Sequence, residues 1–284
     1  KTELVLPFGM DLLLLGDLPS GAGLSSSASL EVLIGFIMRD LYGFDVTNVD
    51  LALIGQQAEH EFCGVNCGIM DQFAVAMGKK DHALLLNTKT LDYEYIPITL
   101  CGVKLIIANS NKKHKLGESK YNERREECET ALEEISQAIG IHALCDLDEK
   151  TWNLYQVTVK DDDRKRRVKH AVTENARTKQ AAAALKNGEL KTFGELMKAS
   201  HQSLSEDYEV TGDEMDALAE AAWQQDGVLG SRMTGGGFGG STISLVKENF
   251  VDEFIQETGR IYTEKTGLSA DFYVVEIGDG PVVQ

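Results

Sequence analysis

The sequence predicts an α+β protein, because strand-like and helix-like segments alternate irregularly along it instead of following one repeated βαβ order. Short apolar runs between residues 83 and 108 form a β-rich centre, and residues 117–225 carry mainly helical patterns. Strands and one helix are mixed again after residue 225. A length of 284 residues slightly favours two domains over one.

The first part of the chain is expected to hold one strand followed by helices. Residues 10–18 are short and mostly apolar, which is typical of a buried strand, and the turn at 19–23 interrupts them. Apolar residues then recur at helical spacing as far as Tyr42, where Gly43 is a C-terminal stop signal. The expected helices cover residues 25–42, 49–62 and 69–77, with a turn-rich link at 64–68.

The rest of the chain is expected to place strands on both sides of the long helical region. A charged run at 161–167 puts acids four residues before bases, which is typical of a solvated helix face without a functional role. The expected strands cover residues 83–86, 93–98, 103–108, 228–233, 242–246 and 272–277, and a helix is expected at 249–266.

The charge balance restricts the possible partners. Twenty-eight basic and 45 acidic residues give a net charge of −17, so nucleic acid and anionic membranes are repelled. An anionic substrate would then need backbone donors or a metal ion instead of a basic patch. Five scattered cysteines predict reduced thiols in a cytoplasmic protein, and no apolar run is long enough for a signal peptide or a membrane span.

The run Pro19–Ser29 indicates an anion site between a strand and a helix. Glycines let backbone N–H groups converge, and the helix start adds unpaired donors and a partial positive charge. A helix N-cap needs only one serine, so the triplet at 25–27 exceeds that structural need. A Walker loop is excluded because no lysine occurs between Lys1 and Lys79, and Ser26 stands where a dinucleotide fingerprint needs its third glycine.

Two further motifs carry candidate chemistry. Asp71 follows a glycine turn at the expected start of a helix, where a carboxylate can accept or orient a hydroxyl proton. Glu59 could offer a hard oxygen to a divalent cation. The run Met233–Ser241 holds five glycines in six positions, which requires its backbone to approach a ligand or another chain segment closely.

Together these stretches resemble the superfamily of galactose, homoserine, mevalonate and phosphomevalonate kinases. The runs at 23–31, 67–72, 118–128 and 173–178 resemble the galactokinase branch most closely, and the resemblance covers nearly the whole chain. It implies a two-domain fold with the active site between the domains. Residues 1–100 would be the remainder of a ribosomal S5 domain 2-like N-terminal part, and residues 101–284 a ferredoxin-like α/β C-terminal domain.

The resemblance also implies the residues of the site. Asp71 would accept the proton of the anomeric hydroxyl of galactose, Tyr121 would contact the sugar, and Ser27 and Glu59 would bind Mg²⁺. The reaction implied is transfer of the γ-phosphoryl group of ATP to galactose, giving galactose 1-phosphate. The residues implied for the ATP phosphates are Gly21, Ala22, Gly23, Leu24, Ser25, Ser26 and Ser27. The glycines implied for an active-site loop are Gly235, Gly236, Gly237 and Gly239.

One family feature is missing from these 284 residues. Galactokinases carry an early segment whose arginine steadies the transferred phosphate and whose acids and histidine bind the sugar. The chain is therefore interpreted as a piece of a longer protein, inactive alone. Two alternatives stay open: another kinase of the superfamily, which a substrate panel would reveal, and a galactose- and ATP-binding sensor, which would bind both ligands without phosphoryl transfer.

Overall fold

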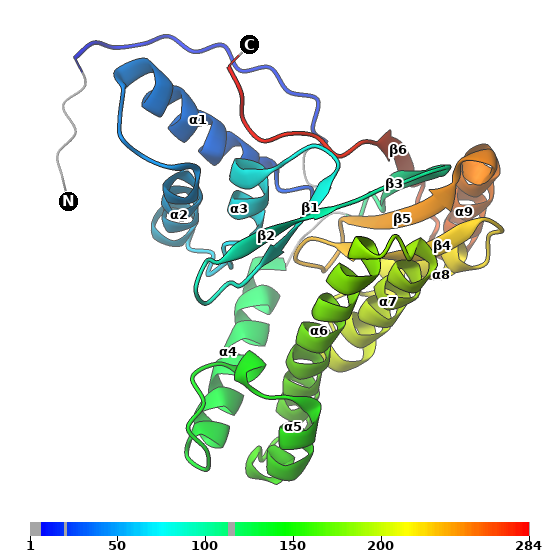
Figure 1. The fold of residues 1–284 in the computed structure, drawn as a ribbon. Helices are drawn as coiled ribbons and strands as arrows, with labels where there is room; N and C mark the ends of the chain where they lie inside the picture. The colour runs from blue at the N-terminus through cyan, green and yellow to red at the C-terminus, as the bar shows by residue number, and fades with distance from the viewer. Residues whose placement is uncertain (1–6, 20–21, 113–116, 284) are drawn as a thin grey trace. The chain divides into compact units, whose positions relative to one another are not determined.

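The computed structural model describes residues 7–19, 22–112 and 117–283, which separate into two compact units (Figure 1). The first unit comprises Leu24–Tyr95 with the described parts of both chain ends. The second comprises Ile96–Glu276 together with Ala22 and Gly23. The domain boundary expected after residue 100 stays a prediction.

Helices dominate the first unit, and local signals explain where they end. Thr47 and Asp50 form a capping box at the start of the second helix, since each side chain accepts a hydrogen bond from the backbone N–H of the other, at 3.1 and 2.7 Å. Gly43 ends the first helix at φ +68°, as expected. The elements are α1 (Ser26–Tyr42), α2 (Asn48–Ala58), a π-helical turn (Glu59–Cys63), α3 (Met70–Met77), β1 (His82–Leu86) and β2 (Tyr93–Pro97), whose last two residues belong to the second unit.

A small apolar core joins the three helices of this unit. Its buried members are Val32, Ala52, Ile69, Phe73 and Ala76. Since these side chains come from all three helices and from the residue before α3, the core determines which ends of the helices meet. The helices predicted at 25–42, 49–62 and 69–77 are confirmed.

The strand predicted at residues 10–18 is wrong. The segment adopts no regular structure, and the side chains of Leu13 and Leu15 are 85% and 86% exposed. A strand needs a neighbour to satisfy its backbone N–H and C=O groups. No strand pairs with residues 10–18 among the described parts of the chain, so the apolar run alone did not produce one.

The second unit is built on a four-stranded antiparallel sheet with the strand order β4-β5-β3-β6. Its strands are β3 (Val103–Asn109), β4 (Val228–Thr234), β5 (Ser241–Lys247) and β6 (Asp271–Val275). Its helices are α4 (Gly117–Ser136), α5 (Glu149–Tyr155), α6 (Asp162–Lys186), α7 (Leu190–Ser203), α8 (Asp213–Trp223) and α9 (Val251–Thr266). The α+β class and the strands predicted in this region are confirmed.

Alternation along the strands covers both faces of this sheet. Val103 and Leu245 pack with Met197 of α7, whereas Ile106 and Val246 pack with α8 and α9. Successive side chains of a strand point to opposite faces, so α7 covers one face and α8 with α9 the other. Gly230 of β4 touches the backbone of α7 so closely that a Cβ would overlap it.

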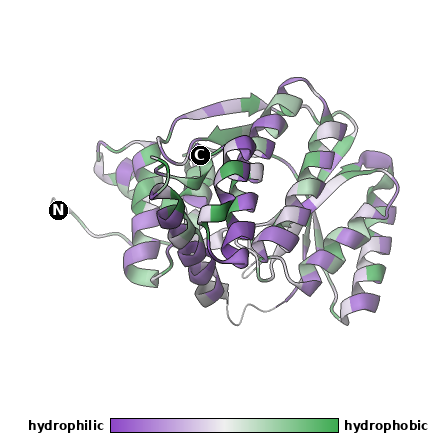
Figure 2. Cartoon of the chain, turned by 90° about the horizontal axis from the view of Figure 1, so that it is seen from below, coloured by the Kyte–Doolittle hydropathy of each residue, from purple (hydrophilic) through white to green (hydrophobic). Residues whose placement is uncertain are grey.

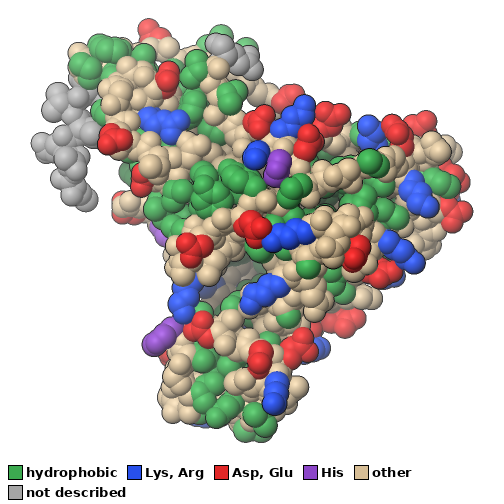
Figure 3. Space-filling view, viewed as in Figure 1, with side chains coloured by type: hydrophobic (Ala, Val, Ile, Leu, Met, Phe, Trp, Pro, Cys, Tyr) green, Lys and Arg blue, Asp and Glu red, His purple; other side chains and the backbone are tan. Residues whose placement is uncertain are grey.

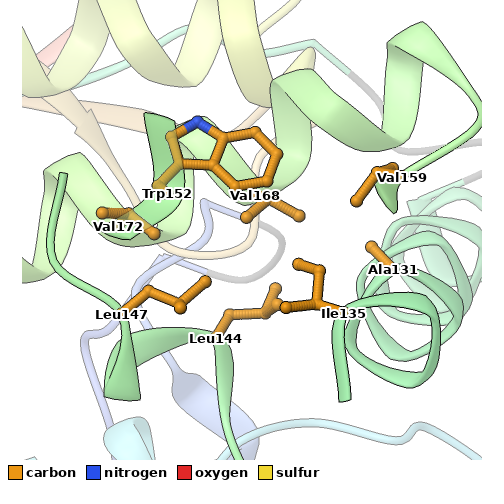
Figure 4. Packing of buried hydrophobic residues seen from close by; sticks show 8 residues of the cluster. All are labelled: Ala131, Ile135, Leu144, Leu147, Trp152, Val159, Val168 and Val172. Carbon is orange, nitrogen blue, oxygen red and sulfur yellow. The ribbon is translucent and has the colours of Figure 1, made fainter. Parts of the chain in front are cut away.

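A helical layer formed by α4, α5 and α6 has its own core (Figure 4). Its buried side chains are Ala131, Ile135, Leu144, Leu147, Trp152, Val159, Val168 and Val172. The charged run at 161–167 lies at the start of α6, and its predicted solvated face is only partly correct. Arg167 is 1% exposed and binds Glu127 and Glu209, at 2.7 and 2.6 Å, so this guanidinium belongs to the interior.

His170 is buried on α6 and should make the protein sensitive to acid. It stacks on Tyr208, and burial lowers the pKa of the imidazole to about 4. Between pH 6.5 and 4 the unfolded chain therefore binds a proton that the folded chain does not. We expect His170 to cost the protein about 2 kcal/mol of stability by pH 5, relative to pH 7.

Urea unfolding at pH 7 and pH 5 checks this expectation. A His170→Gln variant should lose less stability between the two pH values than the unmodified protein. An equal loss in both proteins would contradict it.

The helices carry hydrophilic and hydrophobic residues side by side (Figure 2). Within the described residues, no helix combines the length and the hydropathy that crossing a membrane requires. This agrees with apolar faces that pack within each unit.

Candidate functional site

The serine-rich run enters α1 through a residue in an unusual conformation. Ser25 has φ +55°, in the left-handed region that non-glycine residues rarely adopt. Its hydroxyl does not cap α1 but lies beside the carboxylate of Asp71, whose pKa it acts to lower. The simple N-cap interpretation of the serines is therefore wrong for Ser25, and the donors at the start of α1 remain available to an anion.

Asp71 lies in the first turn of α3, as predicted, and is half-buried. Burial raises the pKa of this carboxyl group, the hydrogen bond from Ser25 opposes the rise, and the negative charge of Glu59 adds to it. A carboxylate with a raised pKa is a stronger base than an exposed one. The geometry thus places a proton acceptor directly against the serine-rich run.

Glu59 occupies the junction between α2 and the π-helical turn, and it is 9% exposed. Burial acts to raise the pKa of Glu59, but hydrogen bonds from Ser27, Glu31 and Cys63 outweigh it and lower the pKa overall. Single π-helical turns are frequent at functional sites. The structure brings together Ser27 and Glu59, the two residues for which metal binding was predicted.

Two residues beside this group were missed from sequence. Glu31 of α1 lies beside Glu59, and burial is the largest cause that raises the pKa of Glu31 to about 7. Gln72 of α3 donates from Nε2 to Glu31 Oε2 at 3.1 Å. For Glu31 the available signal was spacing, since Glu31 follows Ser27 by one helical turn.

The glycine run between β4 and β5 packs against Ala22 and Gly23 within the second unit. The Ser241 hydroxyl donates to the Ala22 carbonyl at 2.6 Å, and a Cβ at Gly235 would lie 2.7 Å from the Gly23 carbonyl oxygen. Gly235 has φ +81°, which a side chain would strain. The close approach predicted for these glycines is therefore to the backbone of Ala22 and Gly23, and it involves Gly235 and Gly240.

The remaining residues predicted for the site lie in different parts of the chain. A Cβ at Gly236 would lie 3.6 Å from Cδ2 of Tyr121 on α4, and Gly237 and Gly239 both have positive φ. Leu24 and Ser26 belong to the first unit, where Ser26 is exposed. Gly21 lies outside the described residues.

The acidic character of the chain persists at the surface. Lys and Arg side chains are interspersed with Asp and Glu over the visible face instead of gathering into a basic patch (Figure 3). Backbone N–H groups at the serine-rich run are therefore the donors that best suit an anionic ligand.

Comparisons with known proteins match both parts of the chain. The family model of the GHMP kinases N-terminal domain matches residues 1–79, and that of the GHMP kinases C-terminal region matches residues 181–260. The galactokinase of Ligilactobacillus salivarius is 51% identical over 275 residues, which cover 97% of this chain and 71% of the relative. The galactokinase of Bacillus subtilis is 50% identical over 97% of this chain and 70% of the relative.

Among solved structures too, a galactokinase is more similar to this chain than a mevalonate or a homoserine kinase. The crystal structure of Lactococcus lactis galactokinase complexed with galactose matches with a TM-score of 0.91 and 45% identity, over 93% of this chain and 68% of that chain. The Methanococcus jannaschii mevalonate kinase matches with a TM-score of 0.59 and 19% identity, over 91% of this chain and 66% of that chain. A homoserine kinase from Cytophaga hutchinsonii reaches 0.56 and 17%, over 93% and 69%. The last two likenesses show a shared fold only.

Proposed function

Because the chain belongs to the galactokinases of the GHMP kinase family, we propose that the protein of which it forms at least a part transfers the γ-phosphoryl group of ATP to O1 of α-D-galactose. The observation that carries this proposal is that the hydroxyl of Ser25, at the start of α1, lies beside the half-buried carboxylate of Asp71 and acts on its pKa. The identity of about 50% to galactokinases, against 14% to 20% for mevalonate and homoserine kinases, favours galactose over the acceptors of those enzymes.

Asp71 is the base in this proposal. Its carboxylate takes the proton from the O1 hydroxyl while O1 forms a bond to the γ-phosphorus, and the bond from that phosphorus to the bridging oxygen breaks to release ADP. Burial raises the pKa of Asp71, which supports this role. Tyr121 would contact the sugar, and the loop at 235–240 would border the active site.

The phosphates of ATP would bind the run 21–27. The unpaired backbone donors at the start of α1 suit an anion, and a chain of net charge −17 offers few alternatives. Ser26 and Ser27 are exposed, so their hydroxyls can reach a ligand. In phosphoryl transfer most of the catalysis comes from positioning and charge neutralisation, which such donors supply.

Ser27 and Glu59 fit a Mg²⁺ ion. Both offer hard oxygens, the Ser27 hydroxyl lies beside the Glu59 carboxylate and helps to lower its pKa, and the lowered pKa keeps Glu59 ionised. Among the described residues no group of three or more His, Cys, Asp or Glu could hold a metal. Two protein ligands are enough for Mg²⁺, which takes its other ligands from phosphates and water. The ion would neutralise charge on the transferred phosphoryl group.

A coupled assay of ADP release by the full-length protein tests this function. We expect turnover with galactose and ATP, none with mevalonate or homoserine, and loss of turnover when EDTA removes divalent cations. Calorimetric binding of galactose and ATP without any phosphoryl transfer would overturn the proposal in favour of the sensor.

A further inference from the structure

Three helices of the first unit meet at a small polar contact between Glu31 of α1, Gly55 of α2 and Gln72 of α3, here called the Glu31–Gln72 junction. Gln72 Nε2 donates to Glu31 Oε2 at 3.1 Å. A Cβ at Gly55 would lie 3.0 Å from Gln72 Cγ and 3.1 Å from Glu31 Oε2. Both side chains therefore pass directly over a residue that has none.

The junction lies within one helical turn of each residue assigned a chemical role. Ser27 precedes Glu31 by four positions on α1, and Glu59 follows Gly55 by four positions. Residues four apart share one face of a helix. Asp71 is the immediate neighbour of Gln72 on α3, and the carboxyl groups of Glu31 and Glu59 lie close enough to shift each other's pKa.

Packing alone does not explain polar residues at this place. Gln72 is 2% exposed, and its Oε1 has no hydrogen-bond partner among the described residues. Burying polar atoms without hydrogen-bond partners costs stability. Apolar side chains carry no such cost, and the core beside the junction consists of them. Gly55 adds a further cost, because glycine inside a helix is a weaker helix former than alanine.

We propose that the Glu31–Gln72 junction is a positioning device, which holds Ser27, Glu59 and Asp71 in the relative arrangement that phosphoryl transfer requires. The proposal rests on the function proposed above and goes beyond it. Glu31 and Gln72 act through Glu59 and Asp71, without touching substrate themselves. Small displacements of reacting groups reduce turnover strongly, so a tight three-helix contact is well suited to this task.

The first test inserts one methyl group into the junction. Gly55→Ala should push Glu31 and Gln72 apart while strengthening α2 as a helix. We expect kcat to fall about ten-fold or more, with little change in the KM for galactose and no drop in melting temperature. The affinity for Mn²⁺ in the presence of ADP, followed by electron paramagnetic resonance, should weaken as well.

Gly35→Ala is the matched control. Gly35 lies inside α1, and a Cβ there would be 3.0 Å from Cδ2 of Leu51, the flexible end of an apolar side chain. The insertion is equally tight but does not touch the junction. We expect unchanged kcat and Mn²⁺ affinity for this variant.

The second test separates positioning from charge. In Glu31→Gln the amide can accept from Gln72 with Oε1 and donate to Glu59 with Nε2, whereas Glu31→Ala loses both contacts. We expect Glu31→Ala to resemble Gly55→Ala, and Glu31→Gln to recover most of the loss.

The outcomes distinguish this proposal from the function on which it rests. The positioning role of the junction would be overturned if Gly55→Ala had the same kcat and Mn²⁺ affinity as Gly35→Ala. It would also be overturned if Glu31→Gln were as impaired as Glu31→Ala. If the unmodified protein phosphorylates no sugar, the proposed function fails. In that case the Mn²⁺ affinities of the four variants still test whether the junction positions Ser27 and Glu59.

Discussion

Asp71→Asn is expected to reduce the kcat for galactose phosphorylation on the order of 10²- to 10⁴-fold. An amide cannot take the proton of a sugar hydroxyl, but its oxygen can still lie beside the Ser25 hydroxyl as the carboxylate oxygen does. The shape of the site and the affinity for MgATP should therefore persist. Steady-state kinetics and calorimetry measure the two quantities separately.

Asp40→Asn provides the control for this variant. Asp40 is exposed near the end of α1, so the same chemical change there should leave kcat unchanged. An Asp71→Asn enzyme that retains more than about a tenth of the normal kcat would show that Asp71 is not the base.

Gly237→Ala should destabilise the protein by roughly 3 kcal/mol or more. The glycine has φ +85°, and a Cβ there would overlap the carbonyl oxygen of Val210. That oxygen also accepts a hydrogen bond from the backbone N–H of Phe238 at 2.6 Å. The loop therefore cannot shift away from the added methyl group without breaking this bond. Urea unfolding measures the loss.

Gly236→Ala is the neighbouring comparison. Its Cβ would meet Cδ2 and Cε2 of Tyr121, at 3.6 and 3.8 Å, which are ordinary van der Waals contacts. Its stability should stay close to that of the unmodified protein. If both variants unfold at the same urea concentration, the glycines are not explained by close backbone approach.

Periodicity predicted most of the secondary structure correctly, because it reports local packing. The helical spacing up to Tyr42 and the stop at Gly43 identify α1, and the apolar run before the glycines identifies β4. The same reasoning failed at residues 10–18, which are equally apolar but have no strand partner in the described structure. Whether an apolar run becomes a strand depends on a distant neighbour.

The charge and glycine patterns did not identify the contacts of their residues, because those contacts also depend on distant parts of the chain. The acids and bases at 161–167 indicated a solvated helix face, but Arg167 is buried because Glu127 and Glu209 come from other elements to pair with it. The glycines of 235–240 indicated a close approach without naming the partner. The partners among the described residues include backbone at Gly23 and Val210.

The sequence by itself determined the kind of chemistry at hand: a serine-rich helix start for an anion, a carboxylate at Asp71 and a hard oxygen donor at Glu59. Only the tertiary structure decided that Ser25 turns its hydroxyl to Asp71, and that Glu31 and Gln72 meet over Gly55. The physical reason is the distance along the sequence between the residues that interact. Helical periods and caps depend on residues a few positions apart, whereas these contacts depend on how three helices pack around one shared core.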